Sequence, residues 1–409
     1  MKLRLLAAAL ASTLFLAQPA ISQTDPVVDL MEQAVRTSPS YRSAKADMDR
    51  ASASARRIAS GPYEFEINAS GGQRKIDDPL ASENRYTEWS AGISRTVRLP
   101  GKRQVDANIA QLETDLAGTG VDQSLFAERE KFAMLWSAWR RADLLSTSSA
   151  SQAAEALRIA ELQQIAVDKG AERQIRADQL AAEAGLLQLQ AEQDRTEAQV
   201  ARAALVARYP DIVFPETTAP LDVSETMISP LFEATAESSP AYRRADLLAE
   251  QARLKAQRAR MEKRPDPTFG LDFGNEFGGS ETSVMARVSI PIGGSARRAY
   301  AREMSATATV AELDRVTAQR EAFQAVQAAR QSLGAAMTLY EKSLETAESS
   351  RKILETIQKG YDYGEITITE FLNGRRALIS AERTVAEQRA RLESAVLYLL
   401  ALTGGPETE

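Results

Sequence analysis

Two segments with alternating hydrophobicity interrupt a chain of 409 residues whose pattern is otherwise helical. In residues 62–97, and again in residues 267–292, apolar side chains alternate with polar ones on both sides of a loop. Alternation with a period of two places the apolar side chains on one face of a strand. The sequence therefore predicts two β-hairpins, the first with a polar loop at residues 71–85. Their apolar face comprises Tyr63, Phe65, Ile67, Trp89, Ile93, Phe269, Leu271, Phe273, Val284, Val288 and Ile290.

This apolar face limits what the hairpins can form. A two-stranded hairpin is marginally stable alone in water, so it needs a sheet to join or a membrane to face. Four strands cannot close a membrane barrel, because their edges would leave N–H and C=O groups unpaired in lipid. Known bacterial barrels have at least eight strands. If the hairpins lie in a membrane, strands from several subunits must combine.

The segments around the two hairpins resemble each other. SPSYR at residues 38–42 reappears as SPAYR at residues 239–243, and AGISRTV at 91–97 resembles ARVSIPI at 286–292. A spacing of about 200 residues between the copies indicates a tandem duplication. The predicted units are a first repeat at residues 23–215, a linker at 216–226 and a second repeat at 227–409.

Outside the hairpins, many apolar residues step by alternating fours and threes, as in coiled coils. Each repeat then consists of a short helix, a β-hairpin, a long helix, a tight turn and a return helix. Gly118 and Gly120 lie inside the first long helix and predict a kink or a tight packing contact. The predicted fold is mainly α, with long antiparallel coiled-coil helical hairpins in two tandem repeats. The predicted helices are residues 27–58, a long helix ending near residue 167, and helices at 175–208, 296–359 and 367–403.

The amino terminus predicts export. Lys2 and Arg4 precede an apolar run, and small residues follow it at Ala20 and Ser22. This is the pattern of a secretory signal peptide at residues 1–22; a buried N-terminal helix is the alternative. Cleavage there removes two of the 50 Lys and Arg residues and none of the 56 Asp and Glu residues, which leaves a net charge of −8. A mildly acidic chain has no electrostatic basis for binding nucleic acid.

The chain has no cysteine and no histidine. Disulfides and thiolate chemistry are therefore excluded, and the commonest transition-metal ligands and the commonest general base are missing. We expect no cofactor, no metal site and no enzymatic activity. An exported carboxylate-based hydrolase is an alternative, although no carboxylate lies in a recognisable pocket-forming context. After the signal peptide no stretch approaches the roughly 18 apolar residues of a membrane helix, so strands must make any membrane contact.

Two strand-to-helix junctions and one turn carry a resemblance to a known family. The junctions are GKR at residues 101–103 and GGSARR at 293–298, and the turn at residues 363–383 places Gly364 eight residues before Leu372. With the hairpin placement and the duplication, these features make nearly the whole mature chain resemble the TolC family of outer-membrane efflux channels. The length and the LPGKR junction look most like the heavy-metal efflux branch typified by CzcC.

This resemblance implies a homotrimer with a twelve-stranded β-barrel in outer-membrane lipid and a helical tunnel in the periplasm, closed at its periplasmic end. It also implies a passive conduit in a tripartite efflux system. A periplasmic adaptor protein docks on the tips, and an inner-membrane efflux pump supplies the energy. Heavy-metal cations are the expected substrates. Type I secretion, multidrug efflux and, in another class, a periplasmic coiled-coil adaptor remain alternatives.

The residue roles that the resemblance implies lie mainly at the two tips. Glu370 and Asn373 match positions that line the periplasmic constriction, and Asp178 corresponds to Glu370 in the first repeat. In that repeat Gly170 precedes Leu180 by ten residues rather than eight. Helix-terminus stabilisation is the alternative role for Glu370. The tip turns predicted for adaptor docking comprise Gly170, Arg173, Tyr361, Tyr363 and Gly364, and an aromatic girdle comprises Tyr63, Tyr86 and Trp89, with core packing as the alternative.

Overall fold

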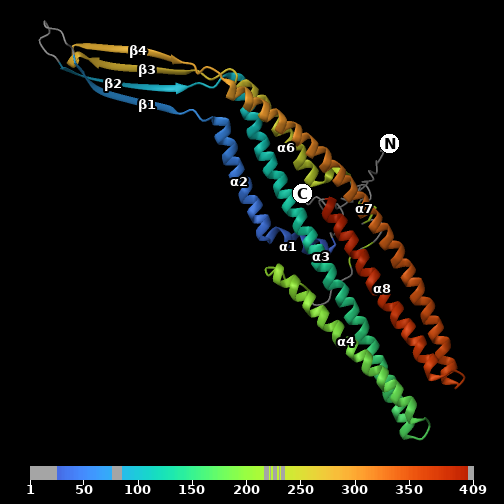
Figure 1. Cartoon of the computed structure of the whole chain (residues 1–409). Coiled ribbons are helices and arrows are strands. Elements are labelled where there is room, and N and C mark those ends of the chain that lie inside the picture. Colours follow the sequence, from blue (N-terminus) through green and yellow to red (C-terminus); the bar gives the residue numbers. More distant parts are fainter. Residues whose placement is uncertain are drawn as a thin grey trace, which may run out of the picture.

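The computed structural model of the protein is elongated, with a β-sheet at one end and two helical tips at the other (Figure 1). It describes residues 25–75, 85–215 and 235–403, together with residues 221, 223, 228, 229 and 231. The predicted signal peptide at 1–22 lies outside the described residues, as does the predicted linker apart from residues 221 and 223.

The elements follow one another in a recurring order. The first half contains α1 (Pro26–Thr37), α2 (Pro39–Ser60), β1 (Phe65–Lys75), β2 (Arg85–Thr96), α3 (Pro100–Asp168) and α4 (Gln174–Arg208). The second half contains the 3-10 helix η2 (Ala236–Ser238), α6 (Pro240–Met261), β3 (Thr268–Glu276), η3 (Phe277–Gly279), β4 (Glu281–Ser289), α7 (Ser295–Asp362) and α8 (Ile368–Thr403). Helix, two strands, long helix and return helix therefore occur twice.

Proline begins several of these helices. Pro26, Pro39, Pro100 and Pro240 lie in the first turn of α1, α2, α3 and α6, where a missing N–H breaks no helical hydrogen bond. The long helices α3 and α7 contain 69 and 68 residues, and their bounds and those of α4 and α8 confirm the predicted helices to within three residues. No described helix is both long enough and apolar enough to cross a membrane.

The single helix predicted at residues 27–58 is wrong, because the chain leaves the helical conformation at Ser38. The Ser38 backbone is extended (φ −62°, ψ 144°), and its hydroxyl accepts a hydrogen bond from the Tyr41 N–H at 3.3 Å, which caps α2. Pro39 follows, and a residue before proline is disfavoured in the helical region. The result is two shorter helices, α1 and α2.

The helix α3 passes without interruption through Gly118 and Gly120. A Cβ on Gly118 would meet no described atom within 4 Å, and one on Gly120 would meet Nη1 of Arg244 at 3.9 Å. The prediction that these glycines allow a tight packing contact is therefore wrong. Their intrinsic cost of about 1 kcal/mol each is small for a helix that buries side chains along most of its length.

The four strands form one antiparallel sheet in the order β1-β2-β3-β4. The central pairing of β2 with β3 joins the two predicted hairpins and places Ile93 opposite Leu271. β1 continues through residues 71–75, which were expected in the loop, and the rest of the predicted loop up to residue 84 lies outside the described residues. β1 and β4 form the two edges of the described sheet.

The largest apolar core lies on one side of the long helices, where α1 and the segment after α4 pack on them. Phe132, Trp136 and Trp139 of α3 and Val396 and Leu399 of α8 are fully buried there. The Trp136 and Trp139 rings meet edge to face, with centroids 5.0 Å apart. Aromatic pairs of this kind add about 0.5–1.5 kcal/mol beyond their buried area. This core therefore holds the two helical hairpins together midway along the molecule.

Candidate functional site

One face of the sheet is apolar, and its side chains are exposed. Three cross-strand rows share this face: Phe65, Arg95, Phe269 and Val288; Ile67, Ile93, Leu271 and Ala286; and Ala69, Ala91, Phe273 and Val284. Trp89 packs beside Phe273, with ring centroids 5.8 Å apart. Ile67 is 82% exposed and Val284 67%. Contiguous exposed apolar patches of this kind mark a surface that binds protein or membrane.

Two residues predicted for this face lie outside the strands. Ile290 follows β4 and is exposed. Tyr63 precedes β1, and its hydroxyl donates to Oδ2 of Asp266 at 3.0 Å. The prediction that Tyr63 belongs to the apolar face of a strand is therefore wrong, because its polar tip is held in the junction below the sheet.

The opposite face of the sheet is polar. Asp272 of β3 is buried against it, where it forms an ion pair with Arg287 at 2.9 Å and accepts a hydrogen bond from Asn68 at 3.3 Å. The carboxylate lies across Gly92 of β2, where a Cβ would come within 2.2 Å of Asp272 Oδ1. A Cβ at position 92 would therefore displace the Asp272 carboxylate from Arg287 and Asn68, and these contacts connect β1, β3 and β4 on the polar face.

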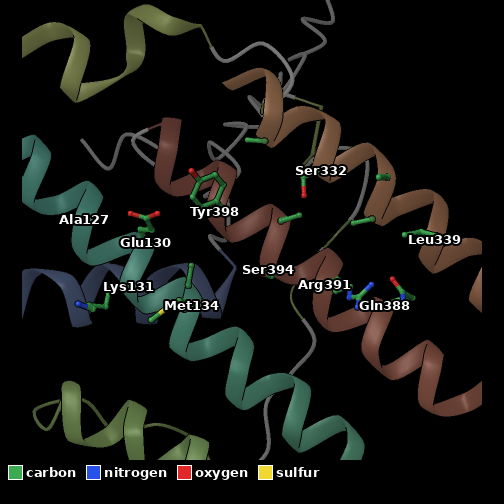
Figure 2. A pocket seen from close by; sticks show the side chains of 15 residues that line it. Ala127, Glu130, Lys131, Met134, Ser332, Leu339, Gln388, Arg391, Ser394 and Tyr398 are labelled. Carbon is green, nitrogen blue, oxygen red and sulfur yellow. The ribbon is translucent and has the colours of Figure 1, made fainter. Parts of the chain in front are cut away.

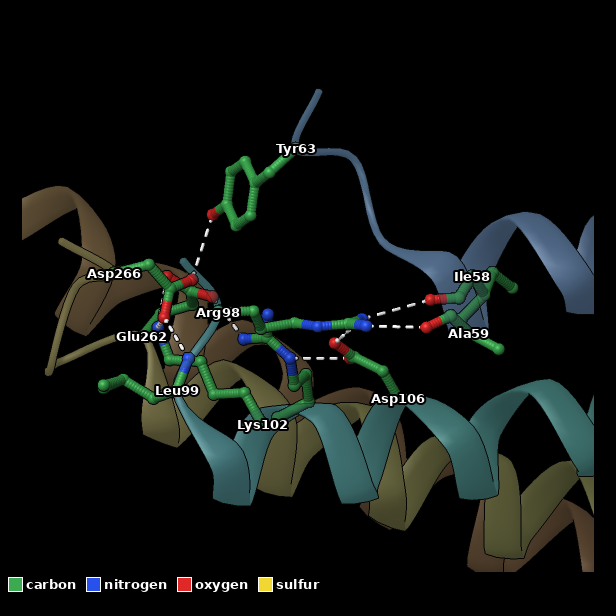
Figure 3. Close-up of polar contacts among 10 residues, drawn as sticks. Ile58, Ala59, Tyr63, Arg98, Leu99, Lys102, Asp106, Glu262 and Asp266 are labelled. Atoms are coloured by element: carbon green, nitrogen blue, oxygen red, sulfur yellow. Dashed lines mark hydrogen bonds and ion pairs between the residues drawn. The ribbon is translucent and has the colours of Figure 1, made fainter. Parts of the chain in front are cut away.

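A buried charged cluster joins the sheet to the helices (Figure 3). Lys102 Nζ lies 3.1 Å from Oδ1 of Asp266, and the two side chains are only 1% and 2% exposed. Asp266 also accepts hydrogen bonds from the Leu99 N–H at 3.1 Å and from Tyr63. Burial acts to raise the pKa of Asp266, but these hydrogen bonds outweigh it and lower the pKa below its ordinary value. Asp266 therefore stays ionised beside Lys102.

Two guanidinium groups extend this cluster. Arg98 Nη1 lies 2.8 Å from Asp106 Oδ2, and Arg98 also donates to the carbonyls of Ile58 at 3.2 Å and Ala59 at 2.6 Å. Arg258 Nε lies 2.7 Å from the other oxygen of Asp106. The end of α2, the start of α3 and the end of α6 are thus connected through one carboxylate.

Sequence reasoning identified the GKR segment at residues 101–103 but missed its partner. Leu99 and Asp266 are hydrogen-bonded across 167 positions of sequence, a contact that the pairing of β2 with β3 makes possible. The sequence does contain one sign of this contact. Asp266 stands between two prolines at the start of an apolar hairpin, and a carboxylate that becomes buried there needs a charged or hydrogen-bonding partner.

Both helical hairpins turn at a glycine with a left-handed backbone. Gly170 follows α3 and Gly364 follows α7, each with φ of 74°. A Cβ at either position would meet no described atom within 4 Å. Backbone conformation, rather than lack of space, therefore requires glycine in these two turns.

The two tips share a small apolar core. Leu180, Phe371 and Leu372 are buried in it, so the longer spacing between Gly170 and Leu180 does not displace Leu180. Tyr361 stacks on Phe371, with ring centroids 4.9 Å apart. Its buried hydroxyl has no hydrogen-bond partner among the described residues, and burial raises the pKa of Tyr361. The prediction that Tyr361 lies in the turn is wrong, because it packs in the last turn of α7.

Glu370 caps α8. Its Oε2 accepts hydrogen bonds from the Thr367 N–H and from the Thr367 hydroxyl, both at 2.9 Å, while Thr367 Oγ1 accepts one from the Glu370 N–H at 3.3 Å. This reciprocal pattern is a capping box. The backbone hydrogen bond and then the hydroxyl lower the pKa of Glu370. The helix-terminus role stated as the alternative is confirmed, and the carboxylate is exposed and charged.

The other predicted tip residues are exposed. Tyr363 is 83% exposed, and Arg173, Asp178 and Asn373 also face solvent. Within the described chain no hydrogen bond or ion pair joins Glu370, Asn373 and Asp178, so one subunit does not bring the predicted constriction residues together. Nor does any group of three or more acidic side chains in that part of the chain lie close enough together to hold a metal ion.

Ion pairs that sequence reasoning missed connect α8 to α4. Arg376 Nε donates to Glu183 Oε1 at 3.0 Å, and Arg383 Nη1 donates to Asp194 Oδ2 at 2.9 Å. Both carboxylates are buried, and each accepts a second hydrogen bond from the same guanidinium. Bidentate pairs of this kind are the strong class of charged hydrogen bond. They tie one helical hairpin to the other between the central core and the tips.

A scan against protein-family models and a search of curated proteins each give no match. Solved structures do match. The outer membrane protein VceC from Vibrio cholerae is similar with a TM-score of 0.73 and 18% identity, over 94% of this chain and 97% of that one. The MtrE outer membrane channel of Neisseria gonorrhoeae, in its open state, gives a TM-score of 0.65 and 17% identity over 93% of this chain and 89% of MtrE.

The CmeC outer membrane channel of Campylobacter jejuni is similar with a TM-score of 0.61 and 16% identity, over 93% of this chain and 86% of CmeC. Similarity that covers nearly all of both chains establishes the fold even at this low identity. The sheet at one end, the two long helical hairpins and the tips are therefore arranged as in these outer-membrane channel proteins.

Proposed function

We propose that the protein is the outer-membrane channel of a tripartite efflux system. Three copies assemble into a passive conduit, in which their sheets close into a twelve-stranded barrel and their helices continue as a tunnel through the periplasm. The observation that carries this proposal is the exposed apolar face of a four-stranded sheet with two open edges. The fold shared with outer-membrane channel proteins supports it.

The apolar face suits lipid better than water. Side chains such as Ile67, Leu271 and Val284 remain more than half exposed, and each Å² of apolar surface left in water forfeits about 25 cal/mol. In lipid, however, the open edges β1 and β4 must be paired, since each unsatisfied backbone group costs several kcal/mol there. Pairing β1 of one copy with β4 of the next satisfies both edges.

In this arrangement the polar face lines the passage. Asp272, Arg287 and Asn68 then face water inside the barrel, while the apolar rows face the outer membrane. A polar interior and an apolar exterior are the ordinary pattern of membrane barrels. This division of faces explains why the Asp272–Arg287 ion pair lies on a sheet whose other face contacts lipid.

We assign the closed end of the tunnel to the tips. Glu370, Asn373 and Asp178 line a constriction there, and three copies of the exposed, charged Glu370 near one axis attract cations. A periplasmic adaptor docks on the exposed turns and couples the channel to an inner-membrane pump. The docking turns comprise Gly170, Arg173, Tyr363 and Gly364, with Tyr361 packed beneath them.

We further propose that residues 1–22 are a signal peptide for export and that residues 23–215 and 227–409 are tandem repeats.

Heavy-metal cations are the proposed substrates. The support for this substrate class is the likeness of the LPGKR junction and of the chain length to the CzcC branch. A strain lacking the protein, with its pump and adaptor intact, is expected to become sensitive to divalent metals such as zinc and cobalt. Sensitivity to organic drugs alone contradicts the metal assignment.

Introduced cysteines test the assembly, because the natural chain has none. A cysteine replaces Ser70 on β1, and a second replaces residues along β4 one at a time. Within a subunit the two strands are separated by β2 and β3, about 14 Å across three strand spacings, which is too far for a disulfide. We expect disulfide-linked trimers in outer-membrane fractions, and only monomers from the single-cysteine controls. A soluble periplasmic monomer contradicts the channel proposal.

A further inference from the structure

A groove of about 970 Å³ lies between α3 and α7, with α8 at its base (Figure 2). It opens on the side of the helices away from the aromatic core. Met134 lines it, and its neighbours on α3 at two-residue spacing, Phe132 and Trp136, lie in the core. Residues two positions apart differ by about 200° around a helix, so Met134 points away from Phe132 and Trp136. The buried alanines Ala133, Ala329 and Ala336 belong to the core and also line the groove, so the groove lies directly over this part of the core.

The groove is lined mainly by alanine and serine, whose small side chains leave its volume unfilled. The larger side chains of Met134, Leu339 and Tyr398 lie at its sides. Met134 and Leu339 are exposed, although they are large and apolar. The small lining residues are Ala127, Ala133, Ala329, Ser332, Ala335, Ala336, Ser394 and Ala395. Pockets of this size that combine apolar walls with a few polar groups are typical sites for small organic ligands.

The charged residues that line the groove are mostly basic. Arg391 and Lys131 are exposed at its rim, and among the described contacts neither has an ion pair or hydrogen bond. Glu130 is the acidic residue of the lining. Burial and then the nearby Glu130 raise the pKa of Tyr398, so its hydroxyl remains a protonated donor at neutral pH. Two cations and a donor therefore face the groove against one carboxylate.

We propose that this groove binds small organic anions with an apolar body, such as aromatic sulfonates and carboxylates. Arg391 pairs with the anionic group, and Met134, Leu339 and Tyr398 contact the body. The inference rests on the proposed function. In the assembled tunnel the groove faces the passage, because α1 and the segment after α4 cover the other side of the helices and would fill the passage if they lay inside. The groove is then an anion-binding subsite on the wall of the passage, distinct from the path of the exported cations, and an anion bound there blocks the current.

The test is direct binding of 8-anilinonaphthalene-1-sulfonate, whose fluorescence rises when it leaves water. The full chain is purified and transferred to nanodiscs of zwitterionic lipid, with empty nanodiscs as background. We expect one saturable site per chain. Arg391→Gln weakens binding about 1.5- to 5-fold, the range for an exposed ion pair. Ala335→Leu, at an exposed helical position, fills the groove and removes the saturable signal.

Arg320→Gln is the matched control, since Arg320 is exposed on α7 outside the groove lining. Its binding is expected to equal that of the wild type. The inference is overturned if Arg391→Gln and Ala335→Leu both bind normally, or if a flat aromatic cation such as proflavine binds equally well. It is also overturned if binding appears only after residues 404–409 are removed, because the tail is then the occupant.

Current measurements separate this inference from the proposed function. In planar bilayers the sulfonate is expected to block the wild-type current, and Arg391→Gln to weaken the block by the same factor as the binding. Saturable binding by a chain that forms no channel contradicts the proposed conduit and supports the proposed anion site in the groove. A conducting channel without saturable binding supports the conduit and contradicts the anion site.

Discussion

Arg383 of α8 and Asp194 of α4 form a bidentate ion pair, with Nη1 to Oδ2 at 2.9 Å and Nη2 to Oδ1 at 3.2 Å. The Asp194 side chain is 3% exposed. Burial acts to raise its pKa, but hydrogen bonds from Arg383, Ser149 and Gln190 lower it below the ordinary value of 3.8. The pair joins two helices that belong to different helical hairpins, so the relative position of the hairpins depends on an ionised carboxylate.

Asp194→Asn is expected to lower the free energy of unfolding by about 1.5–3 kcal/mol at pH 7, the range for a hydrogen bond to a charged group. Because the folded pKa of Asp194 lies below its unfolded pKa, the stabilisation is fully present above the unfolded value. It is lost as the pH falls through the folded value. The difference between wild type and variant should therefore shrink at pH 3. Chemical denaturation at both pH values measures it, with the exposed Asp178→Asn as control. An unchanged difference at pH 3 contradicts the linkage.

The buried pair of Lys102 and Asp266 should show strong coupling. Lys102→Met leaves a buried carboxylate without its cation, which costs about 3–5 kcal/mol. The double variant Lys102→Met, Asp266→Leu should be less destabilised than the sum of the two single variants, because no unpaired charge remains. A double-mutant cycle from denaturant titrations gives the coupling energy. Additive effects within about 0.5 kcal/mol rule out the coupling.

Lysines on the apolar face should prevent membrane assembly. Replacing Phe269, Leu271 and Phe273 together by Lys costs about 2–4 kcal/mol for each lysine near the bilayer centre. Export should be intact, with the protein in the soluble periplasmic fraction. Ser90→Lys with Ser94→Lys on the polar face is the control and should assemble. Outer-membrane assembly of the triple variant would show that these side chains do not face lipid.

Two variants separate the capping role of Glu370 from a role in the constriction. Glu370→Gln keeps an acceptor for the Thr367 N–H and removes the charge, so it should lower cation selectivity and weaken block by multivalent cations from the tip side. Thr367→Ala disrupts the cap and keeps the charge, so it should destabilise the start of α8 and leave selectivity unchanged. Single-channel recordings and thermal unfolding distinguish them. Equal selectivity in wild type and Glu370→Gln leaves Glu370 with its capping role alone.

Local pattern was sufficient for the elements themselves. The bounds of α3, α7 and α8 follow from helical spacing that ends at glycine, and those of α4 from spacing that ends before Pro210. The strands follow from alternation, because each signal resides in neighbouring residues. The break at Ser38 was also local. It depends on Pro39, whose effect on the preceding residue outweighed the helical spacing on both sides.

The sequence by itself determined the spacing of apolar residues in each helix and strand, the positions of the turns, and which side chains share one face of a strand or helix. Tertiary structure alone decided which distant residues meet: Asp266 with Lys102, Asp194 with Arg383, and the three helices around the groove. It also moved Tyr63 from the apolar face to the junction and Tyr361 from the turn to the tip core. The physical reason is that periodicity orients a side chain about its own element, whereas its partner depends on the register between elements, which packing across the whole chain sets.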